Sequence, residues 1–196
     1  MLTGGFYGIF IRIIYKGKRF INMDLEESLL ALKSGEAEAL GSVYDLTKCL
    51  VYSCAFALVK DHFAAEDLMQ ETYLKIRQNI PGYKSKGTGK AWICRIVRNL
   101  ALDQKRRNKK TVPIAGYENT LAGSENKTKQ EFDDIIETAK EILDGQELEI
   151  ILLRTVGDLD HKEISDVLKL PYATARWKYA NAVEKLKKHL ERRDNP

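Results

Sequence analysis

Apolar residues recur every three or four positions along most of the chain from Asp24 onward. This spacing is typical of amphipathic helices, whereas a half-buried strand alternates apolar and polar residues. The helix predicted over about 64–78 is expected to end before Pro81-Gly82, a strong helix-breaking pair. The pattern predicts helices over about 25–35, 39–60, 64–78, 89–110, 146–156, 160–168 and 173–192.

The helical periodicity is interrupted once, over residues 111–130, where Pro, Gly, Ser, Asn and Thr collect. This composition is typical of a flexible linker. The helical pattern returns from about Glu131, and we find no repeat and no convincing strand. The sequence therefore predicts an all-α fold, in which two small helical domains, residues 23–110 and 131–196, are joined by a flexible linker.

The first 22 residues differ from the rest of the chain. Their apolar run, from Phe6 to Tyr15, is far shorter than the ~20 residues that a membrane span needs. No charged leader precedes it and no small-residue cleavage site follows it, which argues against a secretory signal. We expect residues 1–22 to be a disordered extension or the product of an upstream start, because Met23 opens a regular helical pattern. A peripheral membrane anchor is the alternative.

Composition adds little beyond excluding classes of protein. The 196 residues are 44% hydrophobic and 31% charged, as expected for a soluble globular protein. The net charge of +4 is small, so the clustering of basic residues is more informative than their total. Three cysteines, none in a CxxC pair, indicate reduced thiols in a cytoplasmic protein rather than a disulfide or zinc site.

Candidate catalytic chemistry is sparse. The chain has no Gly-rich phosphate loop, no paired metal-ligand spacing and no nucleophile motif. It has only three histidines, and the isolated pair His161 and Glu163 is interpreted as helix surface. We therefore expect no enzymatic activity, metal, cofactor or small-molecule substrate.

The stretch from Asp160 to Leu190 has the layout of a helix-turn-helix. Asp160 can cap the first helix with Glu163 three residues on, and a short turn then leads to Pro171, which suits a helix start. On the second helix, one side is expected to pack and to contain Ala175, Tyr179, Ala182, Val183 and Leu186. The other side is expected to contain Arg176, Trp177, Lys178, Asn181 and Lys185.

A cationic outer face of this kind suits the major groove of DNA, where phosphate contacts supply affinity and Arg176 and Asn181 can read bases. The alternative is an ordinary helical hairpin with a solvated charged face.

Two helices of the first domain are also two-faced. In the helix over about 64–78, Leu68, Thr72 and Ile76 share one side, and Asp67, Gln70, Glu71 and Leu74 lie towards another. In the next helix, the apolar arc contains Trp92, Ile93, Ile96, Val97 and Leu100. The opposite arc contains Arg95, Arg98, Asn99, Leu102, Lys105 and Arg106. The segment from Arg95 to Lys110 contains seven basic residues and only one acidic residue. This basic face is expected either to bind a partner or to be solvated.

The order AEDLMQETYLKI, then KAWICRIVRNLALDQKRR, closely resembles the extracytoplasmic-function class of bacterial sigma factors. The resemblance continues to LDGQELEIILLRTVGDLDHKEISDVLKLPYATARWKY and covers roughly residues 25–192. It implies sigma region 2 over 23–110 and sigma region 4 over 131–196. The implied function is to bind RNA polymerase core, direct it to promoters and help open the DNA. A stand-alone helix-turn-helix regulator, or a sigma-like one, is the alternative, although such a regulator has no use for the DLMQE motif.

The resemblance also implies roles for individual residues. Docking on the clamp helices of the largest polymerase subunit is implied for Asp67, Gln70 and Glu71. Contact with the melted minus-ten element is implied for Arg95, Arg98 and Asn99, with Lys105 and Arg106 on phosphates. Contact with the minus-thirty-five element is implied for Thr174, Arg176, Trp177, Lys178 and Asn181. A cognate anti-sigma factor is a further expected partner.

Three departures from the family pattern bear on these roles. Gly89 replaces a usually apolar residue, Lys169 stands at a turn position usually held by glycine, and Trp177 and Asn181 replace a small polar and a basic residue. A left-handed Lys169 would cost about 1 kcal/mol relative to glycine. The departures affect the predicted promoter sequence rather than the predicted fold.

Overall fold

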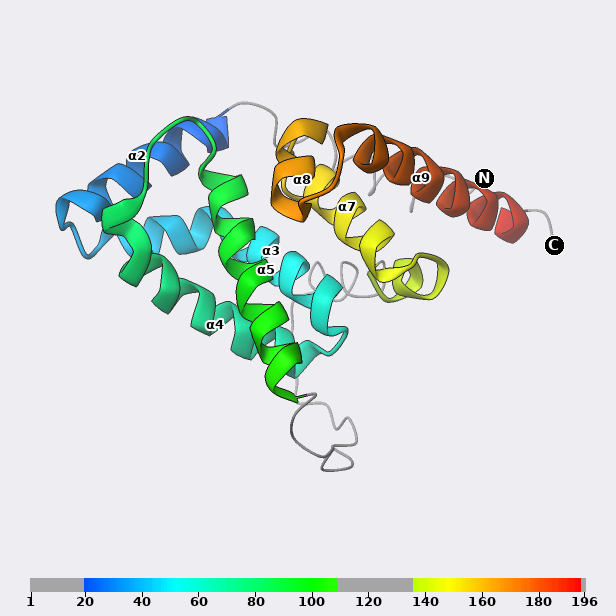
Figure 1. Ribbon diagram of the computed structural model, residues 1–196, viewed down its shortest axis with the longest axis horizontal. Coiled ribbons are helices and arrows are strands. Elements are labelled where there is room, and N and C mark those ends of the chain that lie inside the picture. Colours follow the sequence, from blue (N-terminus) through cyan, green and yellow to red (C-terminus); the bar gives the residue numbers. More distant parts are fainter. Residues whose placement is uncertain (1–19, 109–135, 195–196) are drawn as a thin grey trace.

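The computed structural model describes residues 20–108 and 136–194, and every regular element in these ranges is helical. Figure 1 shows two groups of helices, the first at the left and the second at the right. The first group comprises α2 (Phe20–Ser34), α3 (Ala39–Val59), α4 (His62–Asn79), the 3-10 turn η1 (Ile80–Gly82) and α5 (Gly89–Asn108). The second comprises a helical segment at 136–142, α7 (Gly145–Thr155), α8 (His161–Leu168) and α9 (Tyr172–Asp194).

The helices end where local chemistry stops them. Gly35 follows α2 with a φ of +104°, a left-handed conformation that glycine adopts without steric cost. Asp61 caps α4 by accepting a hydrogen bond from the backbone N–H of Ala64 at 2.8 Å. Pro81 lies in η1, directly after α4. The predicted all-α class is confirmed, and the predicted helix ends agree with the observed ones to within a few residues.

Helix α3 is the central element, and it is contacted by α2, α4, α5 and α7. Because it is covered on several sides, residues 50–57 are buried without interruption. Its length and composition alone would allow α3 to cross a membrane, but half of its apolar window is buried within the protein. That burial identifies α3 as the core helix of the bundle.

The two groups pack directly against each other. Their buried apolar residues form one continuous cluster, in which α3 contacts α7 and α5 contacts α8. A Cβ built on Gly157 would lie 3.0 Å from Cδ1 of Leu50, and Lys140 Nζ donates to the carbonyl of Lys60 at 3.2 Å. The structure is therefore a closed arrangement of the predicted domains.

Two predicted segments fall largely outside the described residues. The linker over 111–130 lies wholly outside them. The extension over 1–22 overlaps them only at its last three residues, which belong to α2.

Candidate polymerase and DNA interfaces

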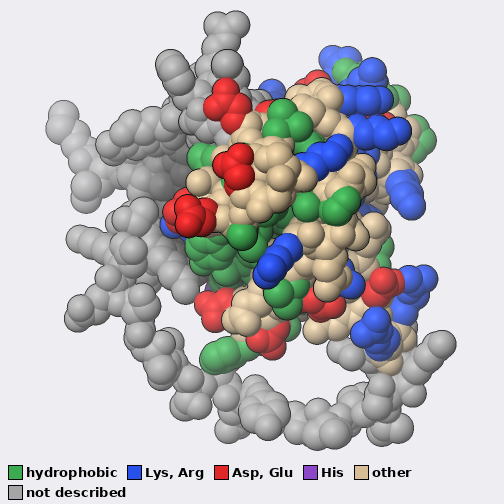
Figure 2. All heavy atoms as spheres, turned by 90° about the vertical axis from the view of Figure 1, so that its left-hand side faces the viewer, with side chains coloured by type: hydrophobic (Ala, Val, Ile, Leu, Met, Phe, Trp, Pro, Cys, Tyr) green, Lys and Arg blue, Asp and Glu red, His purple; other side chains and the backbone are tan. Residues whose placement is uncertain are grey.

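The polar residues predicted for polymerase docking lie on the exposed side of α4. Asp67, Gln70 and Glu71 are all exposed, and 61% of Leu74 is open to solvent beside them. The other side of α4 is anchored by Leu68, Thr72 and Ile76, which are at most 1% exposed. The sequence-based division of this helix into a packed and an outer side is thus confirmed. Figure 2 views this end of the molecule, where acidic side chains lie at the left and along the bottom and most basic ones lie at the right.

A second exposed stripe runs along α5. Arg95, Asn99, Leu102 and Arg106 are exposed at steps of three or four residues, and Lys105 is exposed beside them. On the opposite side, Trp92 is half-buried and its ring centroid lies 4.7 Å from that of Tyr83. Trp92 therefore belongs to the packed side of α5, as its position on the apolar arc predicts.

Arg98, also predicted to contact DNA, is placed differently. Its guanidinium donates hydrogen bonds to both carboxylate oxygens of Glu149 on α7. The exposed fractions of the two side chains are 18% and 6%. Burial raises the pKa of Glu149, while the hydrogen bond and charge of Arg98 act in the opposite direction. This ion pair joins the two halves of the molecule and turns Arg98 inward, and nothing in the spacing of the sequence signals Glu149 as its partner.

The start of α5 and the loop before it are anchored by Glu26 of α2. The Glu26 carboxylate accepts hydrogen bonds from the Gly89 N–H at 2.7 Å, from the Tyr83 hydroxyl at 2.8 Å and from the Ser85 hydroxyl at 2.8 Å. An anion at a helix N-terminus also interacts favourably with the helix dipole. A Cβ on Gly89 would lie 2.8 Å from Cδ1 of Leu29 and 2.9 Å from Oε1 of Glu26, which explains the glycine at this position. The sequence-based reasoning did not identify Glu26.

Helices α8 and α9 form the predicted helix-turn-helix. Asp160 and Glu163 make the predicted capping box at the start of α8, and Ile164, Val167 and Leu168 are buried. Lys169 ends α8 with a φ of 54°, the left-handed conformation anticipated for a position usually held by glycine. The Ser165 hydroxyl donates to the Leu170 carbonyl at 2.7 Å and closes the turn.

The outward side of α9 differs in part from the predicted one. Arg176 and Trp177 are exposed as expected, and Thr174 is half-buried. Val183, expected on the packed side, is 41% exposed. Tyr172, which was not among the predicted contacts, is 52% exposed at the start of the helix.

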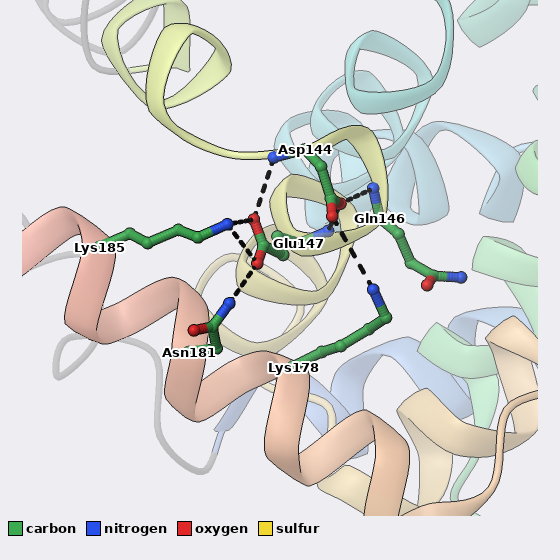
Figure 3. Close-up of polar contacts among 6 residues, drawn as sticks. All are labelled: Asp144, Gln146, Glu147, Lys178, Asn181 and Lys185. Carbon is green, nitrogen blue, oxygen red and sulfur yellow. Dashed lines mark hydrogen bonds and ion pairs between the residues drawn. The ribbon is translucent and has the colours of Figure 1, made fainter.

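Lys178, Asn181 and Lys185 turn towards α7 instead of lying on the outer face (Figure 3). Asn181 Nδ2 donates to Glu147 at 2.6 Å and Lys185 Nζ donates to the same carboxylate at 2.7 Å. Lys178 Nζ lies 3.8 Å from Asp144 Oδ2. Glu147 is only 2% exposed, so it attracts cationic and hydrogen-bonding groups that would otherwise be solvated. DNA contact by Lys178 and Asn181 stays a prediction.

Glu147 has two roles in this network. It completes a capping box with Asp144 at the start of α7, and it holds α9 against that helix. Burial acts to raise the pKa of Glu147, but the hydrogen bonds from Lys185, the Asp144 N–H and Asn181 together bring it below its ordinary value. At neutral pH Glu147 is therefore ionised, and its carboxylate fixes the orientation of α9.

Metal-binding geometry is not found among the described residues, where no group of three or more His, Cys, Asp or Glu side chains converges. Cys54 and Cys94 are buried neighbours with their Sγ atoms 3.6 Å apart, and both are free thiols.

Comparison with known proteins identifies the family of this chain. Residues 43–111 match the family described as Sigma-70 region 2. The RNA polymerase sigma factor SigZ of Bacillus subtilis is 30% identical over 135 residues, which cover 68% of this chain and 76% of that protein. The ECF RNA polymerase sigma factor SigW of the same organism is 22% identical over 87% of this chain and 98% of its own length.

Solved structures show the same fold. CnrH in complex with the cytosolic domain of CnrY aligns with a TM-score of 0.60 at 18% identity, over 85% of this chain and 96% of that one. The sigma factor RpoE of Bartonella quintana, in complex with the anti-sigma factor NepR, aligns with a TM-score of 0.60 at 18% identity, over 79% and 98%. Together with the helix-turn-helix and the exposed faces of α4 and α5, these similarities establish that the chain belongs to the extracytoplasmic-function sigma factors of bacterial RNA polymerase.

Proposed function

We propose that this sigma factor divides its work among three helical faces. The outer side of α4, with Asp67, Gln70 and Glu71, docks on the clamp helices of the largest subunit of RNA polymerase. The exposed stripe of α5 engages the melted minus-ten element, and the outer side of α9 reads the minus-thirty-five element. The factor acts in the cytoplasm by binding and has no chemistry of its own.

The observation that carries the docking assignment is the exposure of Leu74 among the polar residues of α4. Leu74 is 61% exposed, so covering it with a partner would be favourable through burial of apolar surface. It lies beside three exposed polar residues. Among the described residues, the side chains of Asp67, Gln70 and Glu71 make no hydrogen bond or ion pair with another part of the chain. A surface that combines an exposed apolar side chain with exposed polar neighbours has the composition of a protein interface.

The exposed stripe of α5 supports the minus-ten assignment. Arg95 and Arg106 provide cations for the phosphates of a displaced single strand, and Leu102 and Asn99 provide apolar and hydrogen-bonding surface for unstacked bases. Arg98 can join them only after it leaves Glu149.

Promoter binding requires the closed arrangement to open. The names of the two promoter elements place them about 25 base pairs apart, or about 85 Å at a rise of 3.4 Å per base pair. A compact chain of this length has a radius of gyration of about 16 Å, hence a diameter of only about 40 Å. Regions 2 and 4 must therefore separate before α5 and α9 can reach their elements together, and that separation frees Arg98.

One partner other than polymerase and DNA follows from the comparisons as a proposal. CnrH and RpoE were both solved with a partner protein, which in the second case is named an anti-sigma factor. We infer that a cognate anti-sigma factor holds this chain inactive. A stand-alone DNA-binding regulator is the second candidate function, and the exposed α4 face argues against it because such a regulator leaves that face unused.

The docking assignment is tested by measuring the affinity of the full chain for purified core polymerase. We expect Gln70→Ala with Glu71→Ala to weaken binding at least tenfold, because both residues lie on the proposed interface. The matched control is Glu36→Ala with Glu38→Ala, two exposed residues in the turn before α3, which should bind as the wild type does. Equal affinities for the wild type and the α4 variant would overturn the assignment.

A further inference from the structure

Trp177 is a large aromatic side chain with 63% of its surface exposed. It lies on the outward side of α9 together with Ala173, Arg176 and Ala180, all of which are exposed. The two alanine side chains are small and project little beside the indole, so a partner can approach the helix closely. Tryptophan is enriched at binding surfaces, so its exposure on α9 indicates a contact surface.

The charge around Trp177 indicates what kind of partner approaches. The first twelve residues of α9 contain Arg176 and Lys178 but no acid, and Glu184 is the first acidic residue of the helix. Because Lys178 is directed towards Asp144, Arg176 is the cation that flanks the indole on the outward side. A cation beside a helix start that lacks acids favours a polyanion. DNA, rather than an apolar protein surface, is therefore the partner that fits this face.

The chemistry of the indole narrows the contact further. Trp has one N–H donor and two apolar ring faces, and it has no acceptor. In the major groove, the only apolar group that a base presents is the 5-methyl of thymine. Residues near the start of the second helix of a helix-turn-helix are those that reach base edges. Trp177 is the sixth residue of α9 and stands at that position.

We propose that Trp177 reads the 5-methyl group of a thymine in the minus-thirty-five element, with Arg176 on an adjacent base edge or phosphate. The proposal rests on the assignment of α9 to that element. It makes Trp177 a specificity-determining residue that distinguishes thymine from cytosine, adenine and guanine by an apolar contact.

The test uses holoenzyme made from core polymerase and the full chain, on a promoter mapped by run-off transcription. Each thymine of the upstream element is replaced singly by uracil, which removes only the methyl group. At one or two positions we expect affinity to fall about fourfold, the effect of exposing one buried methyl. Trp177→Ala should bind the thymine promoter more weakly and should not respond to uracil, whereas Trp177→Phe should retain part of the response.

Val183→Ala is the matched control, because Val183 is also an exposed apolar residue of α9 and its loss should leave the response to uracil intact. Equal affinity for thymine and uracil at every position would overturn the proposal, as would an upstream element without thymine or a response retained by Trp177→Ala. Each of these results would contradict the role of Trp177 but would be compatible with promoter-specific transcription by the holoenzyme. Failure of the holoenzyme to use any upstream element would instead contradict the proposed function of α9.

Discussion

Arg98 on α5 and Glu149 on α7 form a largely buried ion pair across the contact between the two groups of helices. The pair links a residue predicted to contact promoter DNA with a carboxylate in the other half of the molecule. Its presence explains why an arginine on the polar arc of α5 is not exposed with the others. The pair adds an ionic contact to the apolar cluster that joins the two groups of helices.

Removing Arg98 should be strongly destabilising. Arg98→Ala leaves Glu149 buried without its partner, and breaking a buried pair in this way costs about 3–5 kcal/mol. Chemical denaturation of the single variants, compared with Arg98→Ala combined with Glu149→Leu, measures the effect. The double variant should recover most of the lost stability because it removes the unpaired charge. If Arg98→Ala unfolds at the same denaturant concentration as the wild type, the pair does not hold the two halves together.

Glu147 should make stability depend on acidity. Its pKa is lowered in the folded protein, so its contribution is present above the unfolded value, about 4.3, and is lost as the pH falls through the lower folded value. The difference in unfolding free energy between the wild type and Glu147→Gln should therefore shrink as the pH is lowered from 7 towards 3. Urea titrations at several pH values measure it. A difference that stays constant over this range would show that the carboxylate charge does not stabilise the contact of α9 with α7.

A side chain at Gly89 should crowd the side chains of two neighbours. A Cβ there would come within 3.0 Å of both Leu29 and Glu26, so Gly89→Ala should cost about 1–3 kcal/mol through overpacking. Gly41→Ala is the matched control, because no atom lies within 4 Å of a Cβ at that helical position. It should be neutral or stabilise the protein by about 0.5 kcal/mol. Thermal denaturation compares the two variants. Equal melting temperatures would contradict the close approach of Leu29 and Glu26 to Gly89.

Lys169 offers a stabilising change. Its φ of 54° is left-handed, so Lys169→Gly should raise the free energy of unfolding by about 1 kcal/mol. Lys169→Ala removes the same charge but keeps the Cβ, and it should give no comparable gain. Denaturant titration compares the two variants. An equal gain from both would assign the effect to charge and not to backbone conformation.

The positions and ends of the helices were predictable because they depend on residues close together in the sequence. The capping box of Asp160 and Glu163, the left-handed Lys169 and the packed side of α4 all depend on residues within one or two turns of each other. Arg98 and Glu149 are 51 residues apart, and no periodicity relates them.

The faces of α9 were only partly predictable for the same reason. Periodicity sorts residues relative to one another, but it does not say which neighbour the helix meets. Glu147, on another helix, draws Asn181 and Lys185 towards α7, and Val183 is left exposed. Tertiary contact therefore decides the rotation of α9 about its axis.

The most direct test of the central claim is run-off transcription with purified core polymerase and the full chain on fragments of genomic DNA, followed by mapping of the start sites. If the chain is a sigma factor, we expect discrete start sites that are absent with core alone. These sites should share sequence elements about 10 and about 35 base pairs upstream, because α5 and α9 are proposed to recognise them. Transcription no greater than that of core alone, or start sites without shared upstream sequence, would contradict the account.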